Sequence, residues 1–93
     1  MIKYDVSIYE EQDGSYTAAS NDMDLAENAE SENLALDALA ASVIEYANEY
    51  YDEFQLYSKA PNRKEHLTYI MKALLLNDIE KIRGEMVCRN GEI

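Results

Sequence analysis

The sequence predicts an α+β fold, in which an antiparallel sheet of three or four strands carries two packed helices. Three observations support this prediction. Apolar and polar residues alternate near the N-terminus, an Asp-Gly pair follows that run, and further along apolar residues recur at three- and four-residue steps. The length of 93 residues is that of one domain, so we expect residues 1–93 to fold as a single unit.

The N-terminal segment predicts three consecutive strands. The period-two alternation over residues 2–10 is typical of a strand with one buried face, whose inward side chains would be Ile2, Tyr4, Val6 and Ile8. The pair Asp13-Gly14 supplies the backbone angles of a hairpin turn. Residues 15–20 then form the return strand, and residues 24–30 form a weaker strand that we expect at an edge of the sheet.

Two helices are predicted after the strands. Ser31 is a suitable N-cap for a helix over residues 31–58, which carries an apolar stripe and is ended by Pro61. A second apolar stripe predicts a helix over residues 63–83, capped by Asn62 and stopped at Gly84. Residues 85–89 are short and β-friendly, and are the candidate fourth strand.

Charge is distributed unevenly along the chain, whose formal net charge is −11. Residues 1–58 hold one cation against fourteen acidic residues, which gives −13, whereas residues 59–93 hold seven cations against five acidic residues, which gives +2. Such a field steers basic partners toward the acidic part. The simpler interpretation, that negative charge serves solubility alone, remains open.

The composition also indicates the cellular setting. A single cysteine, Cys88, excludes an internal disulfide and either suits a reducing compartment or is simply a small buried hydrophobe; we favour the second interpretation. The sequence shows neither a signal-peptide pattern nor an apolar run of membrane-spanning length. We therefore expect a cytoplasmic protein that does not bind membranes.

The residue pattern does not predict an enzyme. His66 stands alone in the sequence, and we expect it to be a surface or capping residue. The acidic run from Asp22 to Glu30 lacks the spacing of a calcium-binding loop and is better explained as a solvated edge. The tyrosines are expected in the core or at an interface: Tyr46, Tyr50, Tyr51, Tyr57 and Tyr69. We expect no catalytic residues, no metal and no cofactor.

Residues 2–60 resemble the HicB family of antitoxins. The resemblance is carried by the strand Tyr4 to Tyr9, the acidic turn ending in Asp13-Gly14, the small residues after Tyr16, and the helix entry that begins at Glu30-Ser31. The chain departs from the family pattern where Met23-Asp24-Leu25 stands in place of a Leu-Pro-Gly segment. The resemblance implies a partial ribonuclease-H-like fold without its catalytic acids, and a function in neutralising a small basic mRNA-cleaving toxin of the HicA type.

The predicted mode of action is stoichiometric occlusion of a basic partner, either an RNase toxin or another nucleic-acid-processing enzyme. The candidate contact residues are acidic and lie on the third strand, its turn and the first helix: Asp22, Asp24, Glu27, Glu30, Glu49, Asp52 and Glu53. The second helix suits the core or a homodimer interface, and we expect a homodimer. Direct DNA binding is disfavoured by the net charge, although Arg63, Lys64 and Lys72 are cations near a helix start.

Two other functions are compatible with the same sequence. One is a phage or mobile-element inhibitor that mimics nucleic-acid charge against a host nuclease such as a CRISPR effector. The other is a small oligomeric scaffold whose charge is incidental.

Overall fold

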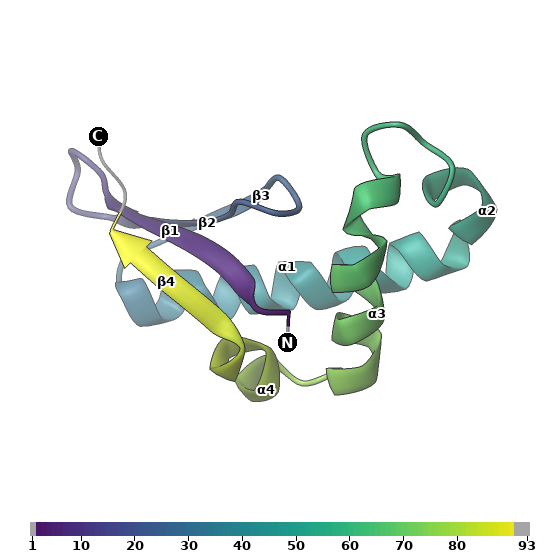
Figure 1. Cartoon of the computed structure of the whole chain (residues 1–93). Coiled ribbons are helices and arrows are strands. Elements are labelled where there is room, and N and C mark those ends of the chain that lie inside the picture. The colour runs from purple at the N-terminus through teal and green to yellow at the C-terminus, as the bar shows by residue number, and fades with distance from the viewer. Residues whose placement is uncertain (1, 91–93) are drawn as a thin grey trace.

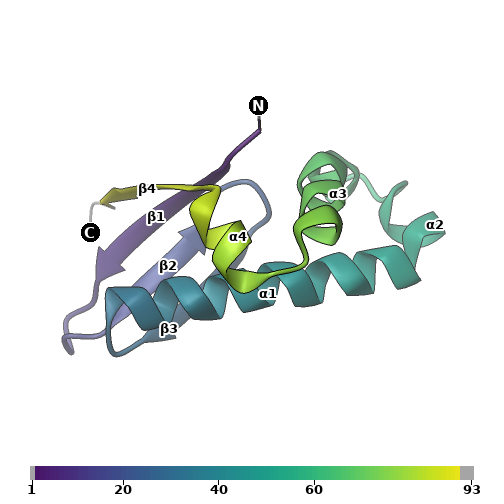
Figure 2. The same cartoon turned by 90° about the horizontal axis from the view of Figure 1, so that it is seen from below.

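Four strands and a long helix set the architecture of the computed structural model, which describes residues 2–90 (Figure 1). The strands β1 (Tyr4–Glu10), β2 (Tyr16–Ser20), β3 (Leu25–Ala29) and β4 (Met86–Asn90) form one sheet in the order β3-β2-β1-β4. The first part of α1 (Glu32–Asp52) crosses beneath this sheet, and the rest of the helix extends beyond it (Figure 2). The predicted α+β fold is confirmed.

The three predicted N-terminal strands are present, but β1 begins at Tyr4 and not at residue 2, and Ile2, expected on the inward face, is exposed. In β1 the buried residues Tyr4, Val6 and Ile8 alternate with more exposed ones, so one face of the strand points into the core. The β1–β2 turn places Gly14 at φ +88°, a left-handed conformation that glycine adopts without strain. β2 pairs antiparallel with both β1 and β3, and this leaves β3 at one edge of the sheet.

The fourth strand is present, but its predicted direction is wrong. β4 pairs parallel with β1, in a register from Tyr4 opposite Met86 to Ile8 opposite Asn90, so the sheet is mixed rather than antiparallel. The chain between β3 and β4 runs through helices that return it to the beginning of β1. A crossover of this kind places the two strands side by side in the same direction.

The first predicted helix is shorter than the expected 31–58. Ser31 caps it as predicted, since its Oγ accepts a hydrogen bond from the Leu34 amide at 3.2 Å. The backbone leaves helical geometry at Glu53, and a short helix α2 (Phe54–Tyr57) follows. The break folds the rings of Phe54 and Tyr57 against that of Tyr50, with centroid distances of 6.3 Å and 5.5 Å.

The second predicted helix, 63–83, is three separate elements. A 3₁₀ turn η1 (Lys64–His66) leads into α3 (Leu67–Leu76), and α4 (Ile79–Gly84) ends at the glycine that was expected to stop the helix. Asn77 adopts a left-handed conformation that ends α3, and the carboxylate of Asp78 caps α4. The predicted Asn62 cap is wrong, because the 3₁₀ turn starts at Lys64 and no side chain caps it.

The core lies between the sheet, α1, α3 and α4. Its largest fully buried side chains come from all of these layers: Tyr4, Val6, Met23, Leu39, Val43, Tyr50, Ile70 and Ile82. Among the tyrosines expected in the core or at an interface, Tyr46 and Tyr50 are buried, Tyr57 and Tyr69 are half-buried, and Tyr51 is exposed. The expected burial of Cys88 is wrong, since β4 is an edge strand and leaves this residue exposed.

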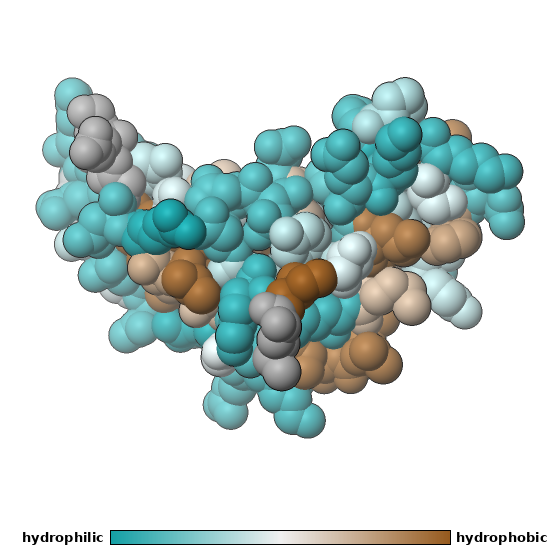
Figure 3. Space-filling view, in the orientation of Figure 1, coloured by the Kyte–Doolittle hydropathy of each residue, from teal (hydrophilic) through white to brown (hydrophobic). Residues whose placement is uncertain are grey.

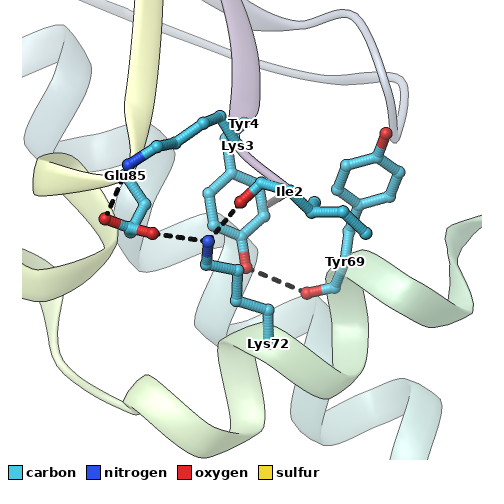
Figure 4. Close-up of polar contacts among 6 residues, drawn as sticks. All are labelled: Ile2, Lys3, Tyr4, Tyr69, Lys72 and Glu85. Carbon is cyan, nitrogen blue, oxygen red and sulfur yellow. Dashed lines mark hydrogen bonds and ion pairs between the residues drawn. The ribbon is translucent and has the colours of Figure 1, made fainter.

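A polar cluster fastens α3 to the beginnings of β1 and β4 (Figure 4). The Glu85 carboxylate pairs with the ammonium groups of Lys3 and Lys72, and Lys72 also donates to the carbonyl oxygen of Ile2. Beneath them the Tyr4 hydroxyl donates to the Tyr69 carbonyl at 2.9 Å. Burial is the main cause that raises the pKa of Tyr4 to about 12, so this hydroxyl keeps its proton at neutral pH.

Candidate functional site

A pocket of about 390 Å³ opens between the β2–β3 turn, the middle of α1 and the segment before α3. We call it the acidic pocket. Its lining combines three carboxylates with an aromatic ring, a histidine and an arginine, and consists of Met23, Asp24, Leu25, Ser42, Glu45, Tyr46, Glu49, Asn62, Arg63 and His66.

One side of α1 supplies four of the lining residues. Ser42, Glu45, Tyr46 and Glu49 follow the spacing i, i+3, i+4 and i+7, which places them along a single stripe of the helix. Within this stripe Tyr46 is buried, whereas Glu45 and Glu49 are exposed. The helix therefore contributes two exposed carboxylates and one buried tyrosine ring to the pocket.

His66 forms part of the pocket wall and is only 8% exposed, so the predicted surface position is wrong. The residue does stand at the N-cap position of α3, although its side chain makes no capping hydrogen bond there. Its Nδ1 lies 2.6 Å from the hydroxyl oxygen of Tyr46. The 3₁₀ turn ends at His66, and its ring lies against that of Tyr46 on α1, with a centroid distance of 5.7 Å. A single histidine in a sequence gives no sign of such a partner, because the contact spans twenty residues.

Arg63 lies over the aromatic side of the site. Its guanidinium carbon is 5.5 Å from the centre of the Tyr46 ring and 4.7 Å from that of Tyr57. The Tyr57 hydroxyl in turn donates to Glu49 at 2.9 Å, and this hydrogen bond is the main cause that raises the pKa of Tyr57. These contacts hold Glu49 and Arg63 in place at the rim.

The structure brings some of the predicted contact residues together and separates others. Asp24 and Glu49 line the acidic pocket, and Glu27 lies beside it, where its carboxylate accepts from the Ser42 hydroxyl at 2.6 Å. Glu30 is exposed at the far end of β3. Asp22 lies apart from the pocket lining, with its carboxylate accepting from the Asp5 amide at 2.9 Å.

The remaining predicted residues, Asp52 and Glu53, are exposed where α1 ends. Sequence reasoning missed Glu45, Tyr46, Arg63 and His66 as members of one site. The helical spacing from Ser42 to Glu49 is the signal that would have grouped the first two. No spacing pattern in the sequence connects Arg63 and His66 with α1.

A second pocket, of about 260 Å³, lies between the end of α1 and α3 and is lined only by apolar and aromatic residues: Tyr50, Tyr51, Phe54, Leu67, Ile70, Met71 and Leu74. We call it the apolar groove. Figure 3 shows hydrophobic side chains gathered over α3 and the adjoining part of α1. Leu75, which is 84% exposed, extends this patch along α3.

Two further properties concern residues 2–90 alone. No three histidine, cysteine or acidic side chains in this range converge as metal ligands. None of its helices is both long and apolar enough to cross a bilayer.

Comparisons with known proteins give a consistent result. The model of a PHD-like family, described as antitoxins of RelE/RelB toxin–antitoxin systems, matches residues 1–88. A crystal structure from Syntrophomonas wolfei subsp. wolfei, described as an antitoxin part of a candidate toxin/antitoxin system, superposes with a TM-score of 0.88 at 32% sequence identity. The match covers 97% of this chain and 64% of that one, so this chain spans less than two thirds of the length of that protein. No curated protein sequence matches the chain.

Proposed function

Because the chain belongs to the PHD-like family of antitoxins, we propose that it neutralises a toxin by binding it stoichiometrically and covering its functional surface, without catalysing a reaction. The family match over residues 1–88 carries this proposal and favours an antitoxin over a charge mimic directed at a host nuclease. The toxin we propose is small, basic and mRNA-cleaving. That choice rests on the HicB-like pattern of the N-terminal strands and on the net charge of −11.

Charge complementarity supports a basic partner. A protein that holds RNA presents clustered cations, and an acidic surface of similar size can occupy them in place of the RNA. We propose that the contact surface includes the seven acidic residues named from the sequence, which lie along β3, its turn and α1: Asp22, Asp24, Glu27, Glu30, Glu49, Asp52 and Glu53. The exposed positions of Asp24, Glu30, Glu49, Asp52 and Glu53 are compatible with this role.

Our proposal does not include operator binding, because two of the three cations named near the helix start already have partners and the net charge is negative. Lys72 already pairs with Glu85, and Arg63 lies over the rings of Tyr46 and Tyr57. Lys72 and Arg63 would therefore have to leave these partners to bind a DNA phosphate. The net charge of −11 adds a repulsive term at long range.

We also propose that the protein is a homodimer, with the apolar groove and Leu75 at the interface. A contiguous apolar patch on a surface is unfavourable in water and commonly marks an interaction site. Sedimentation equilibrium over a range of concentrations tests this: a monomer at high micromolar concentration contradicts it.

The experiment for the main proposal is rescue combined with capture. The full chain is co-expressed with each protein encoded next to its gene, and we expect it to relieve the growth arrest caused by one of them and to copurify with that protein at a fixed ratio. Purified toxin should cleave RNA, and the chain should suppress this cleavage at a stoichiometric and not a catalytic amount. The proposal is wrong if the chain relieves the growth arrest caused by none of the neighbouring gene products. It is also wrong if the chain suppresses toxicity without binding the toxin.

A further inference from the structure

We infer that β4 is an interface with a second copy of this chain, and that the two β4 strands pair antiparallel across a two-fold axis at Cys88. The two four-stranded sheets then join into one continuous sheet. This inference goes beyond the homodimer proposed through the apolar groove, because it uses an edge of the sheet and not the surface between α1 and α3.

The two edges of the sheet differ in how they oppose pairing with another chain. β3, at one edge, carries Glu27 and is flanked by the exposed Asp24 and Glu30, and charged side chains discourage the addition of a strand. β4, the outermost strand at the other edge, contains neither a proline nor an acidic residue (Figure 2). Its one charged side chain, Arg89, is directed across the sheet, with Nε 2.8 Å from Oδ1 of Asp5 on β1. The β4 edge therefore lacks the usual features that prevent pairing.

One backbone contact fixes which residues of β4 point to the free edge. The Tyr4 amide donates to the Glu85 carbonyl at 2.9 Å, so the backbone groups of Glu85 face β1. Along a strand these groups alternate between the two sides. The β1–β2 pairing agrees with this alternation, because the carbonyl of Asp5 faces the other way and accepts from the Asn21 amide at 2.9 Å. Every second residue of β4 therefore presents its N–H and C=O groups at the free edge: Met86, Cys88 and Asn90.

These outward backbone groups are complementary to a second copy of themselves. In an antiparallel pair, facing residues exchange two hydrogen bonds at every second position. A two-fold axis at Cys88 places Cys88 opposite its own counterpart and Met86 opposite Asn90, so all three outward residues of β4 gain partners. An axis at Val87 or Arg89 would leave one of the three without a partner in the facing β4. The backbone therefore favours the axis at Cys88.

The side chains favour a second copy over a strand of the proposed basic partner. In this register Val87 of each copy lies opposite Arg89 of the other, so no like charges face each other. Val87 is 45% exposed, and the aliphatic part of the facing Arg89 side chain would cover some of this surface. The strand also belongs to residues 59–93, which carry a net charge of +2, so a strand rich in cations gains no electrostatic attraction here.

Hydrogen exchange on the full chain tests this pairing without any substitution. In a monomer the Val87 and Arg89 amides are protected by β1, whereas the Cys88 amide exchanges freely. We expect the protection of the Cys88 amide to rise by about tenfold or more as the concentration of ¹⁵N-labelled protein is raised in NMR measurements. The Asn28 amide, at the other edge of the sheet, is the control and should not change. A Cys88 amide that exchanges equally fast at every concentration would overturn the inference.

Two substitutions at Val87 test the register through effects of opposite sign. Val87→Glu places a carboxylate opposite Arg89 of the second copy and should tighten the dimer by about threefold to tenfold, whereas Val87→Lys should weaken it by a similar factor. Bulk charge predicts the reverse order, because the net charge of −11 makes an added acid increase the repulsion between copies. Dissociation constants from sedimentation equilibrium distinguish the two, and the order given by bulk charge contradicts the pairing.

A proline at the axis removes one donor from the interface. Cys88→Pro deletes the outward amide and leaves the hydrogen bonds to β1 in place, since proline is tolerated on an edge strand where its nitrogen faces solvent. We expect this variant to remain folded by circular dichroism and to dimerise at least about tenfold more weakly, whereas Cys88→Ser, which keeps the amide, dimerises like the original chain. Unchanged affinity in the proline variant counts against the pairing. If that variant does not fold, the two Val87 variants still decide.

Cross-linking separates this interface from the apolar groove. The chain has a single cysteine, so a short bismaleimide joins two copies where their Cys88 residues meet. We expect a covalent dimer from the original chain and from Leu75→Lys, which alters the groove surface. Cys88→Ser combined with Asn28→Cys, at the other edge, should give none.

The outcomes for the two interfaces are distinct. If the cross-link is lost in Leu75→Lys, the copies meet through the groove and the β4 pairing is wrong. If it persists and Leu75→Lys leaves the molecular mass in solution unchanged, the groove interface is wrong and the β4 pairing stands. Neither result bears on the antitoxin proposal, which the capture of a toxin tests separately.

Discussion

Leu39 and Leu75 show how differently two leucines on helices contribute to stability. Leu39 is fully buried between α1 and the sheet, whereas Leu75 is 84% exposed on α3. We predict that Leu39→Ala lowers the free energy of unfolding by about 3 kcal/mol, because it removes buried methyl groups and leaves a cavity. At concentrations where the protein is monomeric, Leu75→Ala should change it by less than about 0.5 kcal/mol. Urea denaturation checks both values, and a similar cost for the two variants would contradict the placement of the core.

The Glu85 carboxylate makes stability depend on pH. Hydrogen bonds from Lys72 and then Lys3 are the main causes that hold the pKa of Glu85 below its ordinary value of 4.5. A carboxyl whose pKa is lower in the folded state stabilises the protein above the unfolded-state value, and this contribution is lost as the pH falls through the folded-state value.

We therefore predict that Glu85→Gln is less stable than the original chain at pH 7, and that the difference shrinks as the pH falls below 4.5. Thermal unfolding followed by circular dichroism from pH 7 to pH 3 measures this. The exposed Glu80, which forms no ion pair among residues 2–90, provides the control in Glu80→Gln. A difference that stays constant across the pH range would show that the ion pairs are not the cause.

At the scale of elements, the start of α1 depends on a single hydroxyl. The Ser31 side chain satisfies the Leu34 amide, one of the donors that the first turn of a helix leaves without a partner. We predict that Ser31→Ala lowers the free energy of unfolding by about 1 kcal/mol, whereas Ser31→Asp, which keeps an acceptor, costs much less. Equal losses for alanine and aspartate in urea titrations would show that the cap contributes little.

Local signals predicted some elements well. The alternation in β1, the Asp13-Gly14 turn and the Ser31 cap act over a few residues, and each appears where the sequence placed it. The break at Asn77 was missed because the apolar stripe continues through it, from Leu74 to Ile79 and Ile82, and periodicity alone cannot detect a change of helix axis. The parallel direction of β4 depends on the path of the intervening helices, which no local pattern contains.

The candidate site also depends on long-range packing that local sequence patterns do not contain. Asp24 and Glu49 were named from charge, yet they meet only because β3 lies against α1. His66 and Tyr46 are joined by tertiary packing across twenty residues, so their pairing is invisible to spacing rules. Charge composition thus predicted an acidic surface, while the shape of a pocket within it required the fold.

At the scale of the whole molecule, the net charge of −11 should govern the approach to the proposed basic toxin. Electrostatic steering raises association rates by about 10-fold to 1,000-fold and is screened once salt shortens the Debye length, which is about 10 Å at 0.1 M. We predict that the association rate constant falls by about tenfold or more between 0.05 M and 0.5 M NaCl, while the dissociation rate changes far less. Stopped-flow or surface-plasmon measurements check this, and a rate independent of salt would contradict a basic partner.

The pairing of β4 with β1 also has a consequence for biosynthesis. Tyr4 lies opposite Met86 in the parallel pairing of β1 with β4. During synthesis one edge of β1 therefore stays unpaired until the residues of β4, near the end of the described range, have left the ribosome. During this interval the nascent protein exposes backbone that proteases and other strands can engage. We therefore expect newly made molecules to be more vulnerable to degradation than completely folded ones.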